Sequence, residues 1–190
     1  KYTTLLWATA SLLTSAKGVD ADEFRFFIER MQLAEKYPGI QGIGLSQRLL
    51  RERIPEFEAQ MREYGYPDFK IWPVDDREEY HAILLLEPQD ARNRAALGYD
   101  MFSEPVRRQA MELARDTAAP AASGPVTLVQ EIDENKQPGF LIYVPLYENG
   151  SMPATVEERR ELLLGHAYAP FRAGDMFQGL FPEASLLPLH

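Results

Sequence analysis

The chain has 190 residues, which is enough for one domain, or two small ones, with a substantial buried core. Its formal charge of -9 at neutral pH argues against a nucleic-acid-binding surface, because phosphate recognition requires a basic face. The absence of cysteine excludes disulfide bonds, thiolate metal ligands and a cysteine nucleophile.

No run of about 18 apolar residues occurs, so no segment is expected to cross a bilayer as a helix. The sequence begins with Lys1 rather than methionine and lacks the pattern of a signal peptide. We therefore expect a piece excised from a longer protein.

The first 36 residues have the apolar spacing of helices. A broad apolar face runs from Thr4 to about Ala16, and a second amphipathic pattern follows Asp20, which can cap it. Joined into one kinked rod, these residues would form a stalk of roughly 50 Å, although an ordinary helix hairpin is the alternative. The apolar residues between Leu5 and Phe27 also predict a parallel homodimer through these helices.

Short strand and helix patterns follow in an irregular order. Strands are expected at residues 40–45, 80–86, 126–130, 140–147 and 163–171. Helices are expected at residues 55–64, 156–162 and from Ser103 to Thr117, and residues 133–136 are expected to form a polar hairpin connection. Because the strands occur in hairpins and runs with helices inserted, the pattern indicates an α+β fold rather than a βα repeat.

The most informative segment runs from Gly98 to Arg108 and on to Thr117. It combines a tight turn that carries Asp100, a capped helix with a cationic first turn, and a break. Three other blocks accompany it in a fixed order, namely residues 37–44 (Tyr-Pro-Gly-Ile-Gln-Gly-Ile-Gly), residues 86–88 with 92–94 (Leu-Glu-Pro, Arg-Asn-Arg) and residues 137–147 (Gln-Pro-Gly-Phe-Leu-Ile-Tyr-Val-Pro-Leu-Tyr). In order and spacing these blocks resemble the CHASE domain, the extracytoplasmic sensor module of membrane-bound histidine kinases and nucleotide cyclases, over roughly residues 24–181.

The resemblance implies an α+β fold with a long N-terminal helix followed by two PAS-like subdomains with antiparallel sheets. Residues 1–36 would be the helical stalk, residues 37–181 the sensor core with its ligand-binding half at about 80–147, and residues 182–190 a tail leading toward a transmembrane segment. The implied function is extracytoplasmic, or periplasmic, sensing of a small molecule for a histidine kinase or diguanylate cyclase. No internal sequence repeat supports the two halves independently.

Asp100 is the leading candidate for ligand binding. Plant hormone receptors of this family use an aspartate at the matching position to accept hydrogen bonds from an adenine-type cytokinin, which implies a planar, nitrogen-rich ligand here. A buried carboxylate suits paired N–H donors, since charge-assisted hydrogen bonds are the stronger kind. The alternative is that Asp100 caps the following helix or accepts backbone N–H groups in its turn.

The resemblance also places Thr117 near the ligand, although a hydroxyl at a helix end commonly bonds to a nearby carbonyl. The other expected pocket residues lie on adjacent strands, with plain core as the alternative for most of them, and they are Val126, Leu128, Phe140 and Tyr143. The plant receptors carry a smaller hydroxyl residue at the position of Tyr143. A phenol there would reshape the cavity, which argues against a cytokinin and leaves another small ligand open.

Arg107 and Arg108 place positive charge in a first helical turn, where it opposes the helix dipole. They are expected to form a salt bridge, with Glu87 or Glu104 as candidates, or to meet an anionic ligand.

No catalytic residue, cofactor or metal site is expected. The three histidines are far apart and lack metal-ligand spacing, and no nucleophile elbow, P-loop or dinucleotide glycine signature is present. The alternative to a ligand sensor is a protein-interaction or dimerisation module, and a hydrolase with an unrecognised carboxylate pair is a weaker rival.

Overall fold

The structure is a computed structural model, and it describes residues 1–14, 20–132 and 136–180. Three helices come first: α1 (Tyr2–Leu13), α2 (Ala21–Met31) and α3 (Leu33–Lys36). The expected cap of α2 is confirmed, because the Asp20 carboxylate accepts the backbone N–H of Glu23 and the Glu23 carboxylate accepts that of Asp20.

The strands form one six-stranded sheet. They are β1 (Ile43–Leu50), β2 (Glu79–Glu87), β3 (Ala121–Ala122), β4 (Val126–Thr127), β5 (Pro138–Tyr147) and β6 (Leu163–Arg172). Their order is β2-β1-β6-β5-β3, with β4 also paired to β5, and every pairing is antiparallel. The α+β class is thus confirmed. The arrangement in two PAS-like subdomains is not confirmed, because the described strands share a single sheet.

Short helices connect the strands. They are η1 (Arg51–Arg53), α4 (Ile54–Glu63), α5 (Ala91–Ala95), η2 (Met101–Ser103), α6 (Pro105–Thr117), η3 (Glu148–Gly150), α7 (Val156–Glu161) and α8 (Ala173–Leu180). The first turn of α6 is capped by Glu104 instead of the expected Ser103. Both Glu104 carboxylate oxygens accept backbone N–H groups, those of Val106 and Arg107, at 3.0 and 2.8 Å.

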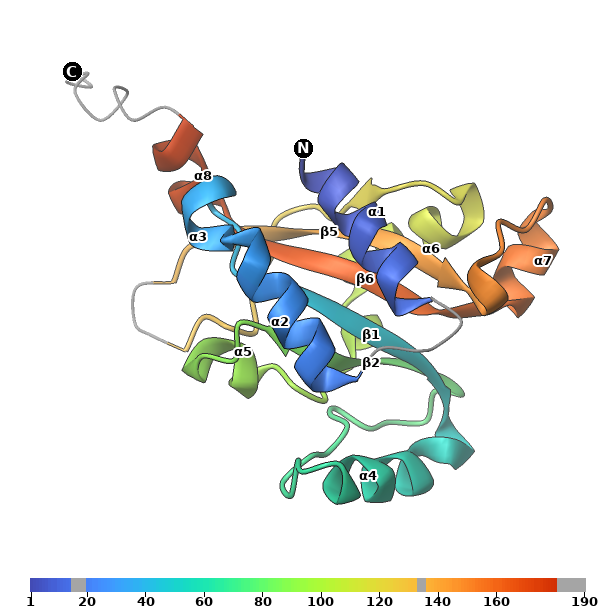
Figure 1. The fold of residues 1–190 in the computed structure, drawn as a ribbon. Coiled ribbons are helices and arrows are strands. Elements are labelled where there is room, and N and C mark those ends of the chain that lie inside the picture. Colours follow the sequence, from blue (N-terminus) through green and yellow to red (C-terminus); the bar gives the residue numbers. More distant parts are fainter. Residues whose placement is uncertain (15–19, 133–135, 181–190) are drawn as a thin grey trace.

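Side chains alternate along each strand, so the sheet presents apolar residues on both of its faces. A different set of helices covers each face. In Figure 1, α1 and α2 cross one face. Apolar residues of these helices pack there with Val144, Ala167 and Phe171. On the opposite face, Ala110, Met111 and Ala114 of α6 pack against Tyr143 and Tyr168, together with Leu86 and Leu141.

The N-terminal helices therefore belong to the core of this chain. Leu5, Leu6, Ala10, Phe24 and Ile28 are all buried against the sheet, so most of the apolar face that suggested a dimer is already covered. The stalk and the domain limits stay predictions, and the expected tail at residues 182–190 and most of the connection at 133–136 lie outside the described residues. Within the described part of the chain, no helix combines the length and the apolar character needed to cross a membrane.

The last helix, α8, follows β6 directly and is held at its start by polar contacts. The Gln137 side chain donates to the Asp175 carboxylate (3.0 Å) and accepts the backbone N–H of Gly174 (2.8 Å). Just before the helix, Nε of Arg172 lies 2.8 Å from the fully buried carboxylate of Glu131. These contacts tie the segment before β5 to the beginning of α8.

A single turn at Pro38 and Gly39 contacts both ends of the described chain. The hydroxyl of Tyr2 in α1 donates to the carbonyl oxygen of Pro38 (3.0 Å). Gly39 has a φ of +80°, and a Cβ at this position would collide with Met176 of α8. Glycine is needed here both for the backbone conformation and for the close approach.

Candidate functional site

The segment that carries Asp100 is fixed between β2 and residue 72. Gly98 turns the chain with a φ of +77°, at a place where any side chain would collide with the carbonyl of Lys70. The backbone N–H of Asp100 then donates to the carbonyl oxygen of Trp72 (2.7 Å), and Asp100 forms an antiparallel bridge with Ala82. The tight turn expected from the sequence is present, and it directs the Asp100 side chain into the interior.

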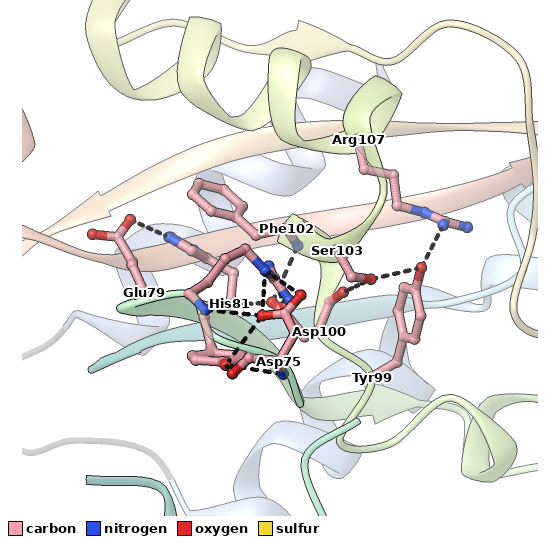
Figure 2. A network of polar contacts seen from close by, with 10 residues as sticks. Asp75, Glu79, His81, Tyr99, Asp100, Phe102, Ser103 and Arg107 are labelled. Carbon is pink, nitrogen blue, oxygen red and sulfur yellow. Dashed lines mark hydrogen bonds and ion pairs between the residues drawn. The ribbon is translucent and has the colours of Figure 1, made fainter. Parts of the chain in front are cut away.

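Asp100 is fully buried and its carboxylate is occupied by groups of its own chain (Figure 2). Oδ1 accepts the backbone N–H groups of His81 (2.7 Å) and Phe102 (3.1 Å), and the latter contact caps η2. Oδ2 lies 2.7 Å from Nη1 of Arg77 as an ion pair. Asp100 thus has the cap role that was the alternative to ligand binding, and its ligand-binding role stays a prediction.

Two histidines lie close together beneath α6. The rings of His81 and His166 are both fully buried, with centroids 5.5 Å apart, and the His81 ring stacks on Phe102. Nε2 of His81 lies 3.1 Å from the Glu79 carboxylate, and Nε2 of His166 lies 3.0 Å from the carbonyl oxygen of Met111. Because both partners are acceptors, each Nε2 carries the proton.

Burial controls the ionisation of this pair. It lowers the pKa of His81, against the opposing effect of the Glu79 carboxylate, and lowers the pKa of His166 well below its ordinary value. Both rings are therefore neutral at pH 7. With the proton on Nε2, each Nδ1 is an acceptor, and neither has a hydrogen-bond partner among the described residues.

Two tyrosines continue this layer across β5 and β6. Tyr143 and Tyr168 are directly paired across the strands and are fully buried, and burial raises the pKa of both phenols. The hydroxyl of Tyr143 lies 3.7 Å from the sulfur of Met101. The hydroxyl of Tyr168 has no hydrogen-bond partner among the described residues. The space behind α6 therefore contains three unpartnered polar atoms, from His81, His166 and Tyr168.

Arg107 points from the first turn of α6 toward Tyr99 (Figure 2). The residue is only 3% exposed. Its guanidinium donates to the Tyr99 hydroxyl (3.1 Å) and to the carbonyl oxygen of Thr127 (2.9 Å), and it lies over the Tyr99 ring. Within the described part of the chain Arg107 has no salt bridge, because Glu104 caps the helix backbone and Glu87 faces Arg25 at 3.6 Å.

The predicted pocket residues do not all lie on one side of the sheet. Val126, Leu128 and Tyr143 pack in the cluster beneath α6. Phe140 lies on the opposite face and stacks on Phe171, because residues three apart on a strand point to opposite faces. Thr117 is exposed, and its hydroxyl donates to the carbonyl oxygen of Leu113 (2.7 Å), as the helix-end alternative expects.

The sequence interpretation missed the polar partners of this layer. The histidines were considered as metal ligands, and Arg77 and Tyr168 were not singled out. One signal could have pointed to these residues: His81, His166 and Tyr168 lie in strand segments whose other residues are mostly apolar. Their proximity depends on the strand order, since β2 and β6 are both neighbours of β1 although about 80 residues separate them in sequence.

Two surface hollows lie elsewhere, along β1. One, of about 300 Å³, separates β1 from α4, and the other, of about 260 Å³, lies between β1, the end of α1 and the start of β6. They share Gln47 and Arg48, and neither is lined by Asp100 or α6. The described residues also contain no group of three histidine or acidic side chains that could hold a metal ion.

A sequence model of the CHASE domain matches residues 17–189. The chain belongs to the CHASE domain family. CHASE domains are extracellular sensor domains of signalling receptors and are generally not catalytic. The resemblance in the four sequence blocks is therefore confirmed.

One curated protein similar to this CHASE domain is the hybrid signal transduction histidine kinase A of Dictyostelium discoideum, which is 29% identical over 108 residues. The matched part covers 55% of this chain but 5% of the kinase. The CHASE domain thus spans a small part of that relative's length.

Proposed function

We propose that this CHASE domain senses a small molecule on the extracytoplasmic side of a membrane, as part of a receptor with a histidine kinase or diguanylate cyclase output. Membership of a sensor family and the similarity to a hybrid histidine kinase support this proposal. Ligand binding would stabilise one arrangement of the domain and so shift the signalling equilibrium of the receptor.

The ligand site would lie between α6 and the sheet, within residues 80–147 and the adjoining part of β6. The observation that carries this assignment is a group of buried polar atoms that have no hydrogen-bond partner in the described structure, namely Nδ1 of His81, Nδ1 of His166 and the hydroxyl of Tyr168. Buried polar groups in proteins are nearly always hydrogen-bonded, so a cluster of exceptions suits a polar ligand. The layer is closely packed, so binding would require α6 to move away from the sheet.

The predicted site residues have different places in this proposal. Leu128, Val126 and Tyr143 would form the wall of the site, and Asp100 would lie at its edge, where it holds η2 and β2 together. Thr117 and Phe140 would lie outside it. A dimer through the N-terminal helices would have to use outward side chains such as Phe26, which is 57% exposed.

Thermal unfolding of the 190-residue chain against a library of small molecules tests this function, together with native mass spectrometry of what co-purifies. A ligand at 100 times its dissociation constant should stabilise the domain by about 2.7 kcal/mol, or roughly 5–10 °C. A screen without any stabilising compound and without any co-purifying molecule would contradict the proposal.

The site itself is tested with Tyr168→Phe, which removes the unpartnered hydroxyl. The unliganded variant should be at least as stable as the wild type, because a buried polar group without a partner is unfavourable. The same variant should bind the ligand more weakly. Tyr64→Phe is the matched control, since Tyr64 is 69% exposed. Unchanged affinity in both variants would place the ligand elsewhere.

A further inference from the structure

Arg107 is a buried cation that forms no ion pair with an acidic residue in the described part of the chain. The guanidinium has five N–H donors, and two of them are used, on Tyr99 and Thr127. Among the described residues, no carboxylate lies within ion-pair distance of it. Glu104, three residues earlier, uses both of its oxygens on the helix backbone.

Such an arrangement is unusual energetically. An ion buried without a counter-ion is destabilising by several kcal/mol, and two neutral acceptors with one aromatic face offset only part of this. By contrast, the Arg77 guanidinium lies 2.7 Å from the Asp100 carboxylate and 2.8 Å from that of Asp75. Among the described residues, Arg107 is a buried cation that has no such acidic partner.

The surroundings of Arg107 are apolar and aromatic. Its contact partner Tyr99 packs at the cluster that contains Met101, Leu128, Tyr143 and Tyr168. Arg107 acts electrostatically on both buried phenols, and its cation favours their ionised forms against the larger effect of burial. The unpartnered hydroxyl of Tyr168 is thus in the same interior region as the unmatched cation.

We propose that Arg107 binds the carboxylate of a small organic acid whose apolar body lies among these aromatic side chains. This inference rests on the proposed ligand-sensing function and names the class of ligand. A planar guanidinium matches a carboxylate in a bidentate geometry, and a single cation in an apolar region suits a monoanion rather than a phosphate dianion. The ligand class differs from a nitrogen-rich base, because both Asp100 oxygens are already engaged by N–H groups of the chain itself.

The test uses the 190-residue chain with acetate, butyrate and benzoate, each compared with its neutral amide at equal ionic strength. At least one acid should raise the unfolding temperature, while its amide should not. In Arg107→Gln the affinity for that acid should fall roughly 10- to 150-fold, the range for losing a charged hydrogen bond. The matched control is Arg108→Gln, which removes the neighbouring charge and should leave the affinity within about twofold.

Arg107→Lys guards against a variant that fails to fold, because it keeps the buried charge and loses only the fork-shaped donor set. It should retain the fold by circular dichroism and bind the acid roughly tenfold more weakly, as expected for one lost hydrogen bond. Equal responses to acid and amide, no response to any of the three acids, or unchanged acid affinity in both Arg107 variants would overturn the inference.

The outcomes also separate this inference from the proposed function. If a neutral compound stabilises the wild type through the Tyr168 hydroxyl and no acid binds, the sensing function is supported. The proposal that the ligand is a carboxylic acid is then refuted. A chain that responds to no compound at all would remove both.

Discussion

Replacing Asp100 by asparagine removes one charge from a buried network without changing the shape of the side chain. The carboxylate holds three groups at once: the N–H of His81, the N–H of Phe102 and the guanidinium of Arg77. An amide oxygen can still accept from the two backbone groups, but more weakly, and Arg77 loses its ion pair with Asp100. Arg77 is 22% exposed, so solvent compensates part of the loss.

The expected loss of unfolding free energy is about 2–4 kcal/mol, slightly less than for breaking a fully buried ion pair. For a chain of this size, each kcal/mol lowers the unfolding temperature by about 2–4 °C, so Asp100→Asn should unfold roughly 5–15 °C lower. Thermal and urea unfolding at pH 7 measure both quantities. Asp68→Asn, on the exposed surface, is the matched control and should change stability by less than about 0.5 kcal/mol.

A double-mutant cycle with Arg77→Gln isolates the ion pair. The two substitutions should be non-additive by about 1–3 kcal/mol, because each alone already breaks the same contact. If Asp100→Asn is as stable as the wild type and additive with Arg77→Gln, the structural role derived from these contacts is wrong. A ligand affinity that falls in a fully stable Asp100→Asn variant would instead support the role of ligand anchor.

Three other substitutions test the packing, the ionisation and the connection to α8. Gly44→Ala should lower stability by about 1–3 kcal/mol in urea unfolding, because its Cβ would lie 2.7 Å from the Tyr168 ring, and a neutral result would contradict the close packing. Burial lowers the pKa of His166 in the folded chain well below 6.5, so the unfolded chain takes up a proton at a higher pH than the folded chain does. The contribution of His166 to the unfolding free energy is therefore fully present above pH 6.5 and is lost as the pH falls below it. Between pH 7.5 and 5.5 this residue should account for a loss of unfolding free energy on the order of 1 kcal/mol that is missing in His166→Gln, and equal pH dependence in both proteins would refute it. Glu131→Gln removes the buried carboxylate that pairs with Arg172, and it should speed amide hydrogen exchange more in α8 than in the strands of the sheet. Unchanged exchange in α8 would show that this helix does not depend on the pair.

Local structure could be predicted where a single segment carries its own signal. The helix expected at residues 156–162 is α7 (Val156–Glu161), which Thr155 caps, and the strand expected at residues 163–171 is β6 with one further residue. The expected strand at residues 126–130 shortens to Val126–Thr127. The strand ends there because Leu128 packs into the cluster beneath α6 instead of continuing the strand pairing. Tertiary packing decided that boundary, and a single sequence does not contain it.

The site was less predictable because its parts meet only through strand order. The turn at Gly98 and the burial of Asp100 follow from local residues, but the partners of Asp100 come from β2 and the segment before it. The burial of Arg107 could not be foreseen, because positive charge in the first turn of a helix is usually solvated. Its environment depends on the position of Thr127 at the far end of a loop of small residues.

The contacts of Pro38 and Gly39 restrict how the two ends of the described chain can move. Tyr2 near the start and Met176 near the end touch the same short turn, and Figure 1 shows α3 and α8 beside each other at one end of the sheet. Sliding of α8 along its axis relative to α1 would have to break the Tyr2 hydrogen bond or separate Met176 from Gly39. The turn at Pro38 and Gly39 therefore couples the position of α8 to the position of α1, because each helix contacts it directly.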